Sequence, residues 1–158
     1  MDEASEAERR FIEQFALLLV EAGMPRMASR VFAAVLAEDS GRLTAGEIAA
    51  RLQVSPAGVS GAVRYLVQVR LLFRGREPGA RSDHYYLSED DPWYAAITNR
   101  AALLARWEES AARGADVLGS ARPAGARLRE TAEFFAFLQV ELPGLLERWR
   151  QSRRTAAG

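Results

Sequence analysis

The sequence of 158 residues contains no cysteine and no lysine, and it has a single histidine, His84. The absence of cysteine excludes a disulfide framework, a thiolate zinc site and thiol-based redox sensing. A metal site would have to consist mostly of carboxylates, and we expect neither a metal nor another cofactor. No apolar run approaches the roughly 20 residues of a membrane span, and the N-terminus is acidic where a secretion signal would be basic. We therefore expect a cytoplasmic protein with no membrane partner.

The arginines are concentrated in the middle of the chain, although the formal net charge is zero. Residues 51–84 carry six arginines against Glu77 and Asp83, which gives this stretch a net charge of +4. A local positive patch is sufficient to neutralise the phosphates of a nucleic acid. Nucleic-acid binding is therefore compatible with the neutral total.

Two amphipathic helices are predicted near the N-terminus. Apolar residues at helical spacing predict a helix over residues 6–22, which ends at Gly23. Its inward stripe is predicted to consist of Phe11, Phe15, Leu18, Leu19 and Ala22. Pro25 suits the first turn of a second helix. The inward residues of that helix are predicted to be Met27, Val31, Ala34 and Val35.

A pair of short helices around a tight joint is predicted next. Thr44 and Glu47 have the spacing of a capping box, which predicts a helix over residues 45–52. After the joint, Ser55 caps the next helix and Pro56 occupies its first position. Its buried stripe is predicted to be Val59, Val63, Leu66 and Val67. The residues predicted to face outward are Ala57, Ser60, Gly61, Arg64 and Gln68.

A two-stranded hairpin and long helices complete the chain. Strands are predicted over residues 71–76 and 84–87, with a Pro-Gly turn between them and a one-residue bridge at Leu43. Asp91 is predicted to cap a helix over residues 93–118. Another helix is predicted over residues 127–141, and Pro143 is predicted to kink or break it before a short helix that ends near Arg150.

This order predicts a mainly α protein with a winged helix-turn-helix, a two-stranded wing and long helices at both ends. We expect three regions: an N-terminal helix over residues 1–24, a winged helix-turn-helix domain over 25–91 and a C-terminal helical region over 92–158. The last region carries more apolar side chains than one small winged domain can cover, so a second copy is expected to cover them.

The helix that begins at Ser55 has small residues where a DNA-reading helix needs them. Such a helix lies in a major groove about 12 Å wide, and bulky side chains would hold it away. Glycine inside a helix costs about 1 kcal/mol relative to alanine, so two glycines need a reason. The predicted DNA contacts on this helix are Ser55, Pro56, Ala57, Gly58, Ser60, Gly61 and Arg64. Arg64 is the candidate for bidentate contact with guanine. The alternative is a helical hairpin buried in a core.

Three arginines of the predicted hairpin are candidates for contacts with phosphates or a narrow minor groove: Arg74, Arg76 and Arg81. The alternative is a solvated edge on which Arg81 pairs with Asp83 or Glu77.

In four segments the chain resembles the MarR family of bacterial transcriptional regulators, and within it the GbsR-like branch. The resemblance rests on "AGMPRMASRVFAAVL", on "LTAGEIAARLQVSPAGVSGAVRYLVQVRLLFR", on the hairpin "PGARSDHYYL" and on "FFAFLQVELPGLLERWR". It implies a two-fold dimer in which an N-terminal dimerisation helix (1–24) and a C-terminal dimerisation region (92–158) interleave, while the domain over 25–91 binds DNA. It also implies a small ligand bound between the dimer and DNA-reading parts. Many members have an acidic residue followed by arginines at the wing tip, where this chain has "GARSD".

Aromatic residues are frequent near the junction of the hairpin and the long helix. Proteins of the GbsR-like branch are associated with quaternary ammonium ligands, which favour aromatic cages. The candidate ligand contacts are Tyr86, Trp93, Tyr94 and Trp107, with Tyr85 beside them. The alternative is that these rings belong to the core and the dimer interface.

We expect a homodimeric, sequence-specific DNA-binding transcriptional regulator that reads a pseudo-palindromic operator. Repression is favoured over activation, and a small-molecule effector is a further expected partner. The alternative is a winged-helix module for protein contacts or for nonspecific architectural DNA binding. The carboxylate run of Glu89, Asp90 and Asp91 suits a helix cap, and no nucleophile is paired with a base. We therefore do not expect an enzyme.

Overall fold

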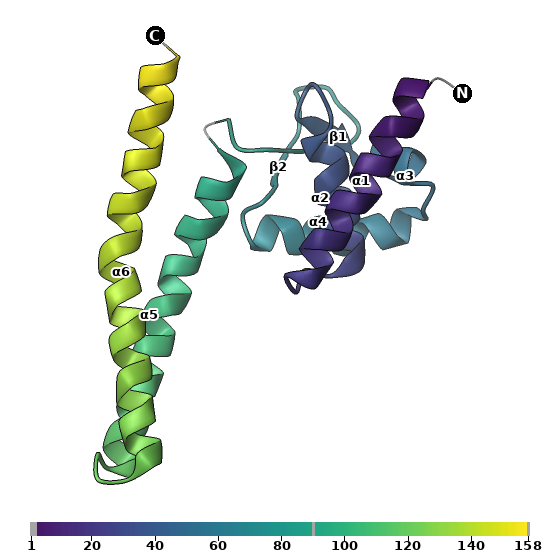
Figure 1. Cartoon of the computed structure of the whole chain (residues 1–158). Helices are drawn as coiled ribbons and strands as arrows, with labels where there is room; N and C mark the ends of the chain where they lie inside the picture. Colours follow the sequence, from purple (N-terminus) through teal and green to yellow (C-terminus); the bar gives the residue numbers. More distant parts are fainter. Residues whose placement is uncertain (1–2, 90, 158) are drawn as a thin grey trace. The chain divides into compact units, whose positions relative to one another are not determined.

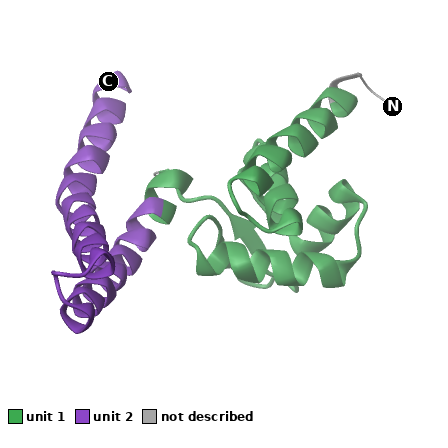
Figure 2. Cartoon of the chain, turned by 60° about the horizontal axis from the view of Figure 1, so that its bottom comes forward, with its two compact units in different colours: residues 1–96 green, residues 97–158 purple. Residues whose placement is uncertain are grey.

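The computed structural model describes residues 3–89 and 91–157, and the chain divides into two compact units, residues 1–96 and residues 97–158 (Figure 2). Asp90 of the acidic run lies outside the described residues. The elements along the chain are α1 (Glu3–Glu21), α2 (Arg26–Leu36), β1 (Arg42–Thr44), α3 (Ala45–Leu52), α4 (Pro56–Gln68), β2 (Phe73–Gly75), β3 (His84–Tyr86), α5 (Pro92–Leu118) and α6 (Pro123–Ala156) (Figure 1). This order confirms the predicted mainly α fold with a small wing.

Helix α2 lies at the centre of the first unit. Its residues from Val31 to Val35 are fully buried, and they pack with Ile48 of α3, Leu66 of α4 and Leu72. The hydroxyl of Ser29 is buried too, and it donates a hydrogen bond to the carbonyl of Pro25 at 3.0 Å. That bond removes the penalty of burying a polar group. The core therefore holds both helices of the helix-turn-helix against one central helix.

Helix α1 buries a different stripe from the predicted one. Ile12 and Ala16 are buried, and Phe15 and Leu19 are partly buried against the core. The predicted inward positions Phe11, Leu18 and Ala22 were wrong, since all three are exposed. Both sides of α1 carry apolar residues, so the periodicity did not decide which side faces α2. Phe11 and Leu18 instead belong to an outer apolar face, together with Leu17.

The sheet has three antiparallel strands in the order β1, β3, β2. Leu43 of β1 pairs with Tyr85 of β3, as the predicted bridge requires, and Arg74 of β2 pairs with Tyr85 from the other side. The prediction that the strand begins at residue 71 was wrong. Leu71 and Leu72 are buried, and their backbone N–H groups both donate to the carbonyl of Leu66, which extends the turn after α4.

Helices α5 and α6 form a hairpin in the second unit, except for the first turn of α5 (Figures 1 and 2). The carboxylate of Asp91 accepts hydrogen bonds from the N–H groups of Trp93 and Tyr94, so the predicted cap is confirmed. The predicted kink or break at Pro143 was wrong as a break, because α6 runs continuously from 123 to 156. Proline there removes a single N–H donor, and the adjoining turns keep their helical hydrogen bonds.

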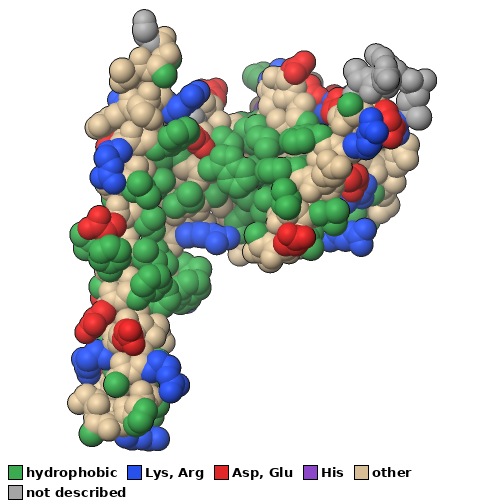
Figure 3. Space-filling model, in the orientation of Figure 1, with side chains coloured by type: hydrophobic (Ala, Val, Ile, Leu, Met, Phe, Trp, Pro, Cys, Tyr) green, Lys and Arg blue, Asp and Glu red, His purple; other side chains and the backbone are tan. Residues whose placement is uncertain are grey.

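Most of the buried residues of α5 and α6 are small. The buried residues are Leu104, Ala111, Ala115, Gly125 and Ala132. The rings of Trp107 and Phe135 also meet, with their centroids 5.3 Å apart. Large apolar side chains of this unit remain exposed, and Figure 3 shows hydrophobic groups along the hairpin: Ile97, Leu103, Trp107, Val117, Phe134, Phe137, Val140, Leu145 and Trp149. Among the described residues, no helix is long and apolar enough to cross a membrane.

Candidate nucleic-acid interface

Side-chain caps fix the first turns of α3 and α4. The hydroxyl of Thr44 accepts from the N–H of Glu47, whose carboxylate accepts in return from the N–H of Thr44 at 2.7 Å. The hydrogen bonds that the N–H and the hydroxyl of Thr44 donate to this carboxylate hold the pKa of Glu47 below its usual value. The hydroxyl of Ser55 accepts from the N–H of Gly58 at 3.3 Å, with Pro56 in the first turn. Both predicted caps are confirmed.

The joint between the two helices is held to α1 and α2. Gln53 ends α3 in the left-handed backbone region, with φ of 53°. Arg30 of α2 forms a bidentate ion pair with Glu13 of α1, and it also donates to the carbonyl of Leu52 at 3.2 Å. Because Arg30 joins α1 to the end of α3, the joint is fixed from outside the helix-turn-helix.

Helix α4 has one buried and one open face, as the sequence predicts. Val59, Val63 and Leu66 are buried, Ala62 is buried with them, and Val67 is half-buried. The exposed residues on the other face are Ala57, Ser60, Gly61, Arg64 and Gln68. The open face therefore carries one arginine, one hydroxyl and little bulk, which suits close approach to another molecule.

The two glycines of α4 are not required by packing inside the chain. A Cβ at Gly61 would meet no atom within 4 Å. A Cβ at Gly58 would make ordinary contacts with Ser55 and Met27, at 3.6 and 3.7 Å. Alanine would fit at both places and would favour the helix by up to about 1 kcal/mol. Glycine at these two positions therefore lowers helix stability without improving packing inside the folded chain.

The arginines of the basic stretch fall into three groups, and the third consists of Arg74 and Arg76 of the wing, which bind Asp83. Arg51 bonds within the first unit, to Glu8 of α1, to Glu38 and to the carbonyl of Ala34. In contrast, three exposed arginines have no ion pair with any described residue: Arg64, Arg70 and Arg81. These three arginines therefore carry positive charge that is available to bind an external anion.

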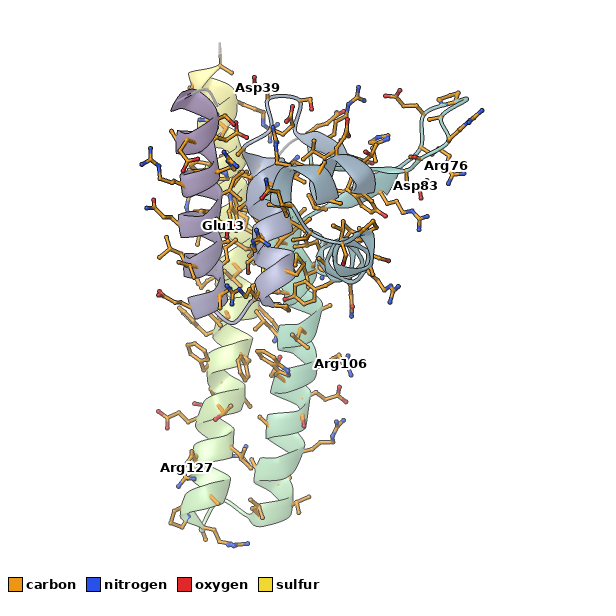
Figure 4. The ribbon with its side chains drawn as sticks, turned by 90° about the vertical axis from the view of Figure 1, so that its right-hand side faces the viewer. Glu13, Asp39, Arg76, Asp83, Arg106 and Arg127 are labelled. Atoms are coloured by element: carbon orange, nitrogen blue, oxygen red, sulfur yellow. The ribbon has the colours of Figure 1, made fainter. Side chains whose placement is uncertain are left out.

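One carboxylate joins the two strands of the wing. Asp83 accepts hydrogen bonds from Nε of Arg74 at 2.6 Å and from Nε of Arg76 at 2.7 Å. These bonds, with Arg76 the larger contribution, hold the pKa of Asp83 below its usual value and raise the pKa of Arg74. Figure 4 shows Arg76 and Asp83 on the hairpin, which projects from the first unit on the side away from α1. Arg74 and Arg76 therefore meet a phosphate only by sharing or leaving Asp83.

The alternative for the wing, in which Arg81 pairs with Asp83 or Glu77, is not the arrangement found. Asp83 binds Arg74 and Arg76, and Glu77 binds Arg42 of β1 at 2.7 Å. Sequence reasoning missed Arg42. Its position beside the predicted bridge at Leu43 was the available signal, but a one-residue bridge was too short to include it.

The candidate ligand rings contact different neighbours. Trp93 forms a T-shaped ring contact with Phe32 of the core, with centroids 5.2 Å apart, whereas Tyr86 packs against Phe73 and His84 of the wing. Trp107 packs against Phe135 in the second unit. These contacts match the alternative in which the rings serve packing, and a ligand site at Tyr86, Trp93, Tyr94 and Trp107 stays a prediction.

Comparison with known proteins gives two family matches that follow one another along the chain. Residues 22–81 match the MarR family model, and residues 91–152 match the model of MmpR5-like MarR family transcriptional regulators. The HTH-type transcriptional regulator MmpR5 of Mycobacterium tuberculosis is 28% identical over 142 residues, which cover 89% of this chain and 86% of MmpR5. The chain belongs to the MarR family.

A solved structure agrees with this placement. A crystal structure described as that of a transcriptional regulator aligns with a TM-score of 0.82 and 27% identity, over 92% of this chain and 99% of the other. The chain is therefore a winged-helix, DNA-binding transcriptional regulator of the MarR family. Since the matched families and relatives are regulators, it is not an enzyme.

Proposed function

We propose that this MarR-family chain acts as a homodimer that binds one pseudo-palindromic operator and represses transcription. In this proposal the open face of α4 enters the major groove, with Ser55, Pro56, Ala57, Gly58, Ser60 and Gly61 close to the DNA. Arg64 contacts a guanine edge, where an arginine can make two parallel hydrogen bonds. The wing arginines Arg74, Arg76 and Arg81 contact the sugar-phosphate backbone or the minor groove.

The observation that carries this proposal is the empty space beside Gly61. Gly61 is exposed on a helix and an added Cβ would meet no atom within 4 Å, so glycine there lowers helix stability without serving packing. The same lack of bulk allows the backbone of α4 to approach base edges closely. Arg64, three residues further along the helix, is exposed and makes no ion pair with a described residue, so its guanidinium is available to a base.

Exposed apolar side chains support the homodimer. On α6, Phe134, Phe137 and Val140 are 55%, 61% and 76% exposed, and on α1 Phe11 and Leu18 are open as well. A monomer would leave these side chains in water, and contiguous apolar surface usually marks an interaction site. We assign residues 1–24 and 92–158 to dimerisation and residues 25–91 to DNA binding. Two-fold symmetry would place the two α4 helices in major grooves about 34 Å apart.

A small-molecule effector that releases the DNA is part of the proposal. It would have to bind the DNA-free arrangement of the two α4 helices better than the DNA-bound one. Membership of the GbsR-like branch, and with it a quaternary ammonium effector held by aromatic rings, stays a prediction. A repressor of this kind would act in the cytoplasm.

Selection of duplexes from a random pool tests the proposal. We expect one imperfect palindrome to be enriched, protected over both half-sites in a footprint, with binding that weakens steeply as salt concentration rises. Sedimentation of the same sample should give a dimer. Enrichment of no sequence, with equal binding to all duplexes, would instead indicate architectural DNA binding. Absence of binding to any duplex would favour a module for protein contacts.

A further inference from the structure

We propose that Arg70 is a further DNA contact, which binds a backbone phosphate beside the end of α4. The inference rests on the proposed binding of α4 in the major groove. Arg70 lies on the short segment that leads from α4 to β2, between Arg64 of the helix and Arg74 of the wing. A phosphate bound here would join the contacts of the helix and those of the wing along one strand of the duplex.

The backbone of Arg70 is held in a conformation that favours glycine. Its φ is +64°, in the left-handed region that L side chains rarely adopt. The two residues after Arg70 impose this backbone conformation, because Leu71 and Leu72 are buried and both of their N–H groups donate to the carbonyl of Leu66. The backbone must therefore change direction at residue 70. Glycine would serve the fold better than arginine at this position.

The side chain of Arg70 makes no polar contact with a described residue that would offset this strain. It is exposed, and it has no hydrogen bond or ion pair with any described residue. Two residues at α4 thus differ from the type that the local backbone favours. Gly61 occupies a position where a helix favours alanine, and Arg70 occupies a position where a turn favours glycine. Both choices suit a surface that a polyanion approaches closely.

The competing reason for a cation at residue 70 is the helix itself. The carbonyl end of α4 carries a partial negative charge, which a nearby arginine stabilises modestly. In that case the side chain would contribute to folding and not to DNA binding. Thermal stability and DNA affinity, measured on the same variants, separate the two reasons.

Gln53 provides a matched control. It is the other described non-glycine residue with positive φ, at +53°, and it is also exposed, at the start of the joint before α4. It faces a small cavity lined by Arg9, Glu13 and Arg30, on the side of α1. Gln53→Gly therefore relieves the same kind of strain without removing a charge.

The experiment compares Arg70→Gly, Arg70→Gln and Gln53→Gly in the full chain, on the selected operator and on a random duplex of equal length. We expect both glycine variants to melt a few degrees higher than the parent. Arg70→Gly and Arg70→Gln should bind both duplexes roughly three- to tenfold more weakly, with a salt slope reduced by about 0.9 per protomer. Gln53→Gly should bind as the parent does.

Two results would overturn the inference. An unchanged salt slope for both Arg70 variants would remove the phosphate contact. A lower melting temperature for Arg70→Gly with unchanged affinity would assign the side chain to the helix end. Either result leaves the operator function standing as long as the parent chain binds its palindrome, whereas a parent chain that binds no duplex would refute the proposed function itself.

Discussion

Asp83 lies directly before β3 and Arg76 directly after β2, and the carboxylate of Asp83 accepts a hydrogen bond from Nε of Arg76 at 2.7 Å. Arg74 bonds to the same carboxylate, so one acid holds two cations side by side. Two strands of three residues are marginal by themselves. We therefore expect this acid to order the hairpin and to set the spacing of the two guanidinium groups.

Replacing this acid should loosen the wing and leave the helices intact. In Asp83→Asn the two arginines lose their common negative charge, and one of the two acceptor oxygens becomes an NH2 donor. We therefore expect faster amide hydrogen exchange in β2 and β3 and unchanged exchange in α2 and α4. In the parent chain, the pKa of Asp83 is held below its usual value of 3.8. Its contribution to wing order is therefore fully present above that value and is lost only as pH falls through the lower, folded-state pKa. Exchange that is already fast in the parent wing at pH 5 would contradict this account.

Arg64→Ala should weaken specific binding by roughly 1 to 3 kcal/mol. The reason is the loss of a bidentate contact to guanine, so preference should relax at one position of each half-site. Repeating the operator selection with the variant measures both effects. An equal loss on every duplex would instead assign Arg64 to a phosphate.

Gly61→Ala should stabilise the fold and weaken DNA binding. Alanine gains up to about 1 kcal/mol in a helix, and the added methyl meets nothing in the free chain but would meet the DNA. Gly46→Ala is the control, because Gly46 of α3 is also exposed and an added Cβ there would meet no atom within 4 Å. It should stabilise the chain with no effect on binding. Equal DNA affinity of the two variants would show that close approach at Gly61 is not needed.

Phe137→Glu should dissociate the proposed homodimer. Phe137 is a large, exposed apolar side chain on α6, and loss of a dominant interface side chain typically costs about 2 kcal/mol or more, roughly thirtyfold in dissociation constant. Arg127→Glu places the same charge at an exposed position near the start of α6 and should leave the dimer intact (Figure 4). Analytical ultracentrifugation over a range of concentrations distinguishes the two. A Phe137→Glu chain that sediments as the parent does would exclude this face from the interface.

Gly125→Ala should destabilise the α5–α6 hairpin by about 1 to 3 kcal/mol. A Cβ at Gly125 would lie 2.0 Å from the carbonyl oxygen of Gly119, a distance that requires the backbone to move. Gly144→Ala in the same helix meets only the flexible end of Arg148, at 3.7 Å, and should be neutral or stabilising. Thermal unfolding followed by circular dichroism compares the two. Similar melting temperatures would mean that the hairpin tip adapts freely.

The sequence predicted those parts of the fold that depend on local chemistry. The capping box of Thr44 and Glu47 defined the start of α3, and the Ser55 and Pro56 pair defined the start of α4. The outward face of α4 also followed from its spacing. These features depend on residues within a few positions of one another, and no distant contact competes with them.

The incorrect predictions concern features that local sequence does not determine, such as contacts between residues far apart in the sequence. Which side of α1 faces α2 depends on the shape of α2, so Phe11 and Leu18 were misplaced. The proline rule predicted a kink or a break in α6, and the break was wrong, because losing one donor at Pro143 does not end this helix. The partners of the wing arginines depend on strand register, which places Asp83 between Arg74 and Arg76 and which a hairpin pattern alone does not specify.

Thr44 has two structural roles at once: it is the last residue of β1, paired with His84 of the wing strand, and it caps the first turn of α3. A displacement of the hairpin is therefore transmitted to the front of the helix-turn-helix through a single amino acid. Engagement of the wing by a duplex should accordingly slow solvent exchange at the Glu47 amide, which donates to the Thr44 hydroxyl.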